Sequence, residues 1–90
     1  MSSEGAVLII DDEKEIRESL EQLLGVEGYR VSSAPTAEEG LKKADEGVFD
    51  LVLLDINLPD RSGLDVLKIL RRDTPDMGVI MMGRNRMRHP

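Results

Sequence analysis

The stretch Ala6-Val7-Leu8-Ile9-Ile10, followed at once by Asp11-Asp12, decides the fold of this chain. A second stretch has the same form, because Leu51-Val52-Leu53-Leu54 is followed by Asp55. A strand that is apolar at every residue has to be covered on both faces, which is typical of a central strand in a parallel sheet. Sites in such sheets form beyond the carboxyl ends of the strands. If the two strands are neighbours, we expect Asp11, Asp12 and Asp55 to converge on one spot.

Short strands and helices alternate along the rest of the chain. The predicted strands cover residues 6–10, 29–34, 51–54 and 79–82, and the predicted helices cover residues 13–25, 37–46 and 64–72. This βαβαβαβ order with short connections predicts an α/β fold built on a doubly wound parallel sheet with right-handed crossovers. The strand at 51–54 should be fully buried, whereas the strand at 29–34 alternates more and suits an edge position.

Local signals predict the start of each helix and the face that it turns to the sheet. Asp11 or Asp12 can cap the first helix, and Thr36 with Glu39 forms a capping-box pattern before the second helix. The positions expected to face inward are Ile16, Leu20, Leu23 and Leu24 in the first helix, Ala37, Leu41 and Ala44 in the second, and Leu64, Leu67 and Leu70 in the third.

Composition limits the classes of protein to which the chain can belong. Ninety residues allow one domain, and 12 Lys+Arg against 18 Asp+Glu give a net charge of −6. This charge argues against direct binding of nucleic acid or of an anionic membrane by the body of the chain. The apolar runs are far shorter than the roughly 20 residues that span a bilayer, and the first residues lack the basic region of a signal peptide. We therefore expect a cytoplasmic protein.

Three carboxylates at one edge of a sheet repel one another, so such a cluster is tolerated mainly when a cation sits in it. Hard oxygen ligands suit Mg²⁺, which takes few protein ligands and keeps several waters. A carboxylate beside bound Mg²⁺ can act as a nucleophile toward phosphorus. The structural alternative is that Asp11 or Asp12 only caps a helix and that Asp55 lies in a solvated turn. The occurrence of carboxylates at two strand ends together favours the metal site.

The same residues resemble the receiver domain of two-component response regulators. The acidic pair in residues 8–13 matches the family, and residues 55–63 have its Asp-x-x-x-Pro-x-x-x-Gly form; the resemblance covers residues 6–82. It implies a flavodoxin-like sheet and a sensor histidine kinase that supplies a phosphoryl group to Asp55. It also implies a Mg²⁺ site made by Asp11, Asp12, Asp55 and the backbone carbonyl of Asn57.

The chain departs from the family toward its carboxyl end. Residues 1–82 resemble a receiver truncated after the fourth strand, without the last helix, strand and helix, and residues 83–90 form an atypical basic tail. The family has a Thr or Ser where this chain has Gly83, and a Lys on a fifth strand that is missing here. We therefore expect impaired phosphorylation. We also expect a homo-oligomer, formed by pairing of the exposed fourth strand or by exchange of elements.

The sequence leaves one of three other functions open and argues against the other two. A phosphorylation-incompetent, dimerising pseudo-receiver differs only in whether Asp55 accepts phosphate, and the sequence leaves this open. A phosphatase or mutase of the haloacid dehalogenase type needs Asp-x-Asp, but the third position here is Asn57. A nucleotide-binding Rossmann domain needs Gly-x-Gly-x-x-Gly after the first strand, where this chain has acidic residues. The expected function is therefore a phosphoacceptor signalling domain and not an enzyme.

Overall fold

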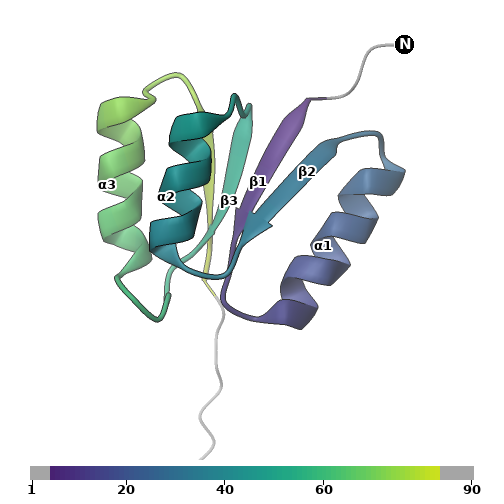
Figure 1. Ribbon diagram of the computed structural model, residues 1–90, viewed down its shortest axis with the longest axis horizontal. Coiled ribbons are helices and arrows are strands. Elements are labelled where there is room, and N and C mark those ends of the chain that lie inside the picture. The colour runs from purple at the N-terminus through teal and green to yellow at the C-terminus, as the bar shows by residue number, and fades with distance from the viewer. Residues whose placement is uncertain (1–4, 84–90) are drawn as a thin grey trace, which may run out of the picture.

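The structure, a computed structural model, describes residues 5–83. Its elements in chain order are β1 (Ala6–Ile10), α1 (Lys14–Val26), β2 (Arg30–Ala34), α2 (Ala37–Glu46), β3 (Leu51–Asp55), α3 (Gly63–Asp73) and β4 (Gly78–Met82). The strands form one parallel sheet in the order β2-β1-β3-β4 (Figure 1). This is the doubly wound, flavodoxin-type arrangement predicted from the sequence, and within residues 5–83 it lacks the final helix, strand and helix.

Strand β1 lies at the centre and is buried along its whole length. Each of its five residues is at most 4% exposed, because β2 and β3 flank it in the sheet and α1 and α2 contact it. The register with β3 runs from Val7 opposite Leu51 to Ile10 opposite Leu54. The two strands therefore end level with each other, and the acidic residues that close them are neighbours.

The two faces of the sheet are covered unequally. Leu8, Ile10, Val52 and Leu54 belong to the main core on the side of α2 and α3, which lie next to each other in Figure 1. The alternate positions of β3, Leu51 and Leu53, point to the opposite face and are only half-buried. The expectation of a fully buried strand is therefore wrong for this face, since within the described residues only α1 packs there.

The predicted inward faces hold for α2 but need correction in the other helices. In α2, Ala37 and Ala44 are buried and Leu41 packs against the core. In α1 every residue keeps some exposure, and Leu23 is 59% exposed because no second helix of the described part lies beside α1.

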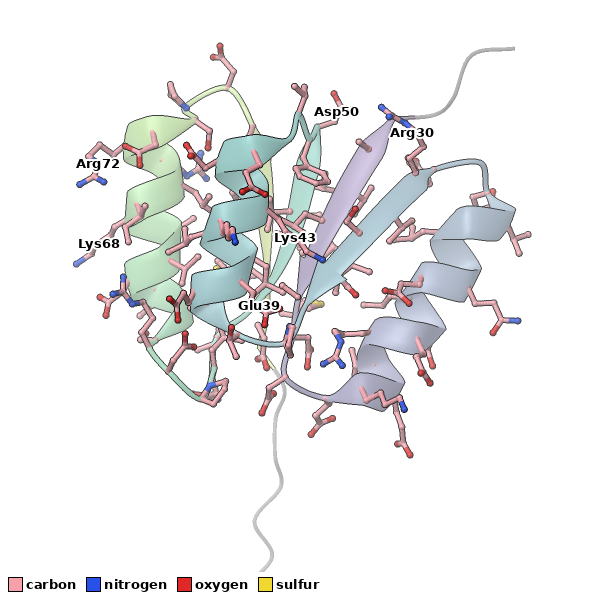
Figure 2. All side chains as sticks on the ribbon, viewed as in Figure 1. Arg30, Glu39, Lys43, Asp50, Lys68 and Arg72 are labelled. Carbon is pink, nitrogen blue, oxygen red and sulfur yellow. The ribbon has the colours of Figure 1, made fainter. Side chains whose placement is uncertain are left out.

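In α3 the prediction is confirmed at Leu67 and Leu70 and wrong at Leu64. Val66 and Leu70 are buried, whereas Leu64 is 54% exposed. The reason is the close packing of Gly63 against the end of β3, which directs the positions three and seven residues later toward the sheet. Lys68 and Arg72 lie on the outer side of this helix (Figure 2).

The two edge strands differ in character. On β2, the Ser33 hydroxyl donates to Glu21, and the Lys43 ammonium donates to the Ser33 carbonyl at 2.6 Å, so neighbouring helices cover this edge with polar groups. On β4, Ile80 is 52% exposed. Apart from Gly83, the predicted basic tail lies outside the described residues. Among the helices of residues 5–83, none has the length and apolar character needed to cross a membrane.

Two glycines allow a direct test of this packing. A Cβ added at Gly63 would lie 2.3 Å from the Asp55 carbonyl oxygen and 2.7 Å from the Ile56 Cα, and these backbone atoms cannot move without distorting the loop. We predict that Gly63→Ala lowers the free energy of unfolding by about 1–3 kcal/mol. The control is Gly25→Ala in α1, where the added Cβ meets open space and should stabilise the helix by about 0.5–1 kcal/mol. Urea unfolding followed by circular dichroism measures both, and equal effects would contradict the prediction.

Candidate functional site

Three carboxylates meet at the carboxyl edge of the sheet, as the sequence predicts. Asp11 and Asp12 follow β1, and Asp55 ends β3; each contributes one oxygen, and these oxygens all lie within 4.8 Å of one another. Asp11 is 1% exposed and Asp55 is fully buried, while Asp12 is exposed. The cluster therefore has a buried floor and an open side from which a small ligand can enter.

Backbone amides hold the two buried carboxylates in place. The Glu13 N–H donates to Asp11 Oδ1 at 2.8 Å, and the Asn57 N–H donates to Asp55 Oδ1 at 3.2 Å. The first bond replaces the predicted cap, because the N-cap residue of α1 is Glu13, whose side chain makes no capping bond. The Arg17 guanidinium donates to the Asp11 carbonyl at 2.9 Å and so joins the first turns of α1 to the same edge.

The donor set fits a small, hard divalent cation. Carboxylate oxygens are preferred ligands of Mg²⁺, and ligands held at about 2.0–2.1 Å are at most about 4 Å apart. The 4.8 Å limit on the oxygen separations is close to this value, so a small movement of the exposed Asp12 would complete the contact. Ionised carboxylates this close repel one another, and a bound cation offsets that repulsion. Asp11, Asp12 and Asp55 could therefore hold Mg²⁺.

The loop between β3 and α3 begins directly after Asp55. It is closed where it begins and ends: the Gly63 N–H donates to the Ile56 carbonyl at 2.6 Å, and Asn57 and Ser62 form an antiparallel bridge. Ser62 Oγ accepts the Leu64 N–H at 3.0 Å and so caps α3. Asn57, the fourth predicted site residue, is thus fixed two positions from Asp55, and its role as a carbonyl ligand stays a prediction.

Sequence reasoning did not predict the role of Asp60, a residue of the same loop whose carboxylate caps α2. Its two oxygens accept the N–H groups of Ala37 and Glu38, each at 2.9 Å, at the start of α2. These two backbone hydrogen bonds lower the pKa of Asp60 below its ordinary value of 3.8. Thr36 Oγ1 accepts the Glu39 N–H at 3.2 Å, so half of the predicted capping box is confirmed. No local pattern indicates Asp60, since its partners lie more than twenty residues earlier.

Asp50, an acidic residue at the other end of the sheet, has a structural role. Asp50 lies at the same end of the sheet as Arg30 (Figure 2), and its carboxylate accepts the Ala6 N–H at 2.8 Å. It thereby fixes the start of β1 against the start of β3. The structure also places Gly83 next to the acidic edge, because a Cβ at Gly83 would lie 3.0 Å from the side chain of Ile56, the residue after Asp55.

Comparison with known proteins agrees with this geometry. The family model described as the response regulator receiver domain matches residues 7–89. The chain belongs to this family. A receiver is a phosphoacceptor signalling module rather than an enzyme in the usual sense, and the cluster of Asp11, Asp12 and Asp55 resembles its phosphoacceptor site.

One curated relative and two solved structures show the extent of the likeness. The receiver is 43% identical over 76 residues to the transcriptional regulatory protein DltR of Streptococcus agalactiae, which covers 84% of this chain and 34% of that protein. Response regulator TrrA from Thermotoga maritima, crystallised in complex with Mg²⁺-BeF, superposes with a TM-score of 0.85 at 41% identity, over 90% of this chain and 70% of the other. A chain in the complex of histidine kinase ThkA with TrrA gives 0.82 at 38% identity, over 93% and 74%. The receiver thus spans about a third of the length of the curated relatives it matches.

The lowered pKa of Asp60 predicts a pH-dependent contribution to stability. A carboxylate whose pKa is lower in the folded than in the unfolded chain stabilises the fold above its unfolded pKa, and this stabilisation is lost as the pH falls through the folded value. We predict that Asp60→Asn lowers the melting temperature at pH 7, and that the difference from wild type shrinks once the pH falls below about 3.8. Thr36→Ala removes an uncharged cap of the same helix and should give a pH-independent difference. Thermal melts of all three chains at pH 7 and pH 3 measure this, and a constant difference for Asp60→Asn would contradict it.

Proposed function

We propose that this receiver accepts a phosphoryl group on Asp55, with Mg²⁺ held by Asp11, Asp12, Asp55 and the backbone carbonyl of Asn57. One observation carries the proposal: a fully buried carboxylate at the end of β3 has carboxylate oxygens of two neighbouring residues within 4.8 Å. The Mg²⁺-BeF complex of TrrA supports the choice of metal.

The chemistry needs a nucleophile that is held still and a site that tolerates the charge on phosphorus. An oxygen of Asp55 forms the new bond to phosphorus while the bond from phosphorus to the donor's leaving atom breaks. The Asn57 N–H fixes the rotation of the Asp55 carboxylate through its bond to Oδ1. A bound Mg²⁺ would neutralise charge on both the donor and the acceptor.

A sensor histidine kinase is the proposed donor. The complex of ThkA with TrrA, a receiver to which this chain is similar, supports this partner. The exposed side of the cluster, at Asp12, is where the donor's phosphoryl group would enter, because the other two carboxylates are buried.

The chain carries Gly83 where the family has a hydroxyl residue, and this favours slow phosphorylation of the 90-residue chain. In enzymes, removing one hydrogen-bond donor that stabilises charge in the transition state lowers the rate by about 10²–10³-fold. No lysine follows Lys68 in the 90 residues either. Gly83 in place of a hydroxyl residue also favours the second candidate function, a phosphorylation-incompetent pseudo-receiver.

Replacing Gly83 tests the proposed phosphoacceptor site directly. We predict that the wild-type chain is labelled slowly by a small phosphodonor, that Asp55→Asn abolishes the label, and that Gly83→Thr raises the rate by about 10²-fold. Gly83→Ala is the matched control, since it adds a Cβ beside Ile56 without a hydroxyl and should leave the rate unchanged. Mass spectrometry with time measures the labelled fraction. Equal labelling of wild type and Asp55→Asn would exclude Asp55, and no labelling of any variant would favour the pseudo-receiver.

We also propose that the 90-residue chain self-associates through β4. Within residues 5–83 this strand is an edge, and Ile80 exposes half of its surface there. An apolar edge with free backbone pairing positions recruits further strands. The polar cover of β2 makes the opposite edge a poorer partner.

A charge placed on β4 should prevent this association. We predict that Ile80→Lys shifts the chain from dimer to monomer in sedimentation velocity across a concentration series, because a lysine on an edge strand opposes pairing. Leu64→Lys is the control, since Leu64 is equally exposed but lies on α3. A wild-type chain that stays monomeric at all concentrations would overturn the proposal, as would equal effects of the two variants.

A further inference from the structure

The loop between β3 and α3 is attached to the rest of the molecule in two places. Its base is closed by the bond from the Gly63 N–H to the Ile56 carbonyl and by the bridge between Asn57 and Ser62. Its tip is attached elsewhere, because Asp60 bonds the first two amides of α2. Between the two attachments, Leu58 packs against the core. The loop that carries Asn57 is therefore fixed to the end of β3 and also to a helix that follows β2.

The attachment at the tip consists of two charge-assisted hydrogen bonds from one side chain, that of Asp60. A carboxylate that accepts two backbone N–H groups at 2.9 Å makes charge-assisted hydrogen bonds, which are about twice as strong as neutral ones. The negative charge also lies at the positive end of the α2 dipole. Ala37 is fully buried and so anchors this end of α2 in the core. The tip of the loop is thus tied to a part of the fold that does not move easily.

We propose that Asp60 is a positioning residue for the cation site: by holding the loop against the start of α2, it fixes Asn57 where its backbone carbonyl can reach a divalent cation bound by the acidic cluster. This inference rests on the proposed function, because it requires the cation site. It adds that the affinity of the site depends on a residue that does not touch the cation. Groups that orient metal ligands from outside commonly contribute 10- to 100-fold to affinity.

Thermodynamic coupling between the cation site and the attachment of Asp60 acts in both directions. If the attachment of Asp60 raises cation affinity, then cation binding must strengthen the attachment by the same factor. Binding of Mg²⁺ at the acidic cluster should therefore slow hydrogen exchange of the Ala37 and Glu38 amides. The start of α2 would in this way report on the occupancy of a site on neighbouring strands.

The controls separate positioning from general stability and from charge. Thr36→Ala weakens the same end of α2 but leaves the loop attached, since Thr36 caps the Glu39 amide. Asp65→Asn removes one negative charge from the first turn of α3 and leaves the bonds of Asp60 to α2 in place. Asp60→Asn retains one acceptor oxygen and is the milder variant if Asp60→Ala does not fold.

The experiment is a titration of the 90-residue chain with Mn²⁺, in which electron paramagnetic resonance counts the free ion. We expect Asp60→Ala to weaken binding by about 10-fold, Asp60→Asn to weaken it less, and both controls to bind like wild type. Slower exchange of the Ala37 and Glu38 amides on addition of Mg²⁺, lost in Asp60→Asn, would further support the proposal.

Other outcomes would overturn it, and they differ from failure of the proposed function. Wild-type affinity in Asp60→Ala and Asp60→Asn, with binding abolished by Asp11→Asn, would refute the positioning role and leave the cation site standing. An equal loss in Thr36→Ala would show that only the stability of α2 matters. Absence of Mn²⁺ binding by the wild-type chain, or binding unchanged in Asp11→Asn, would remove the cation site and this inference with it.

Discussion

The parallel pairing of β1 with β3 is the constraint on which the rest of the molecule depends. Their register sets Ile10 opposite Leu54, so the residues that close the strands meet at one edge. The same pairing buries β1 on both sides, and burial of apolar surface supplies most of the stability of a domain of this size. The same strand pairing therefore determines both the fold and the position of the acidic site. A shift of one residue in this register would turn every side chain of the strand to the other face and separate the carboxylates.

The acidic site brings three carboxylates together at one edge of the sheet. Asp11 and Asp55 are buried, and each has a carboxylate oxygen within 4.8 Å of oxygens of the other two acidic residues. Backbone amides of Glu13 and Asn57 compensate part of this charge. A cation that binds the folded but not the unfolded chain stabilises the fold by mass action.

The sequence predicts the features that follow from local pattern and misses those that depend on how elements meet. The all-apolar run of β1 and the acidic residues after it indicate both a central strand and the convergence at its end, and the structure confirms both. Periodicity finds Leu67 and Leu70 in α3 but wrongly includes Leu64, because the contact of Gly63 with the backbone of β3 turns Val66 and not Leu64 toward the sheet. The half-exposure of Leu53 depends on which helices are present on its face. Asp60 has no local signal at all, since its hydrogen-bond partners belong to another βα unit.

The central position of β1 also affects how the chain can fold during synthesis. The partners of β1 begin at Arg30 on one side and at Leu51 on the other, so both follow it in the chain. Until residue 55 has left the ribosome, the most apolar segment of the molecule has at most one neighbour. Contacts between distant segments form slowly, and apolar strands exposed in the meantime are prone to aggregate. The acidic pair after β1 places two charges directly beside that segment, where they help to keep the nascent chain in solution before they have any partner to bind.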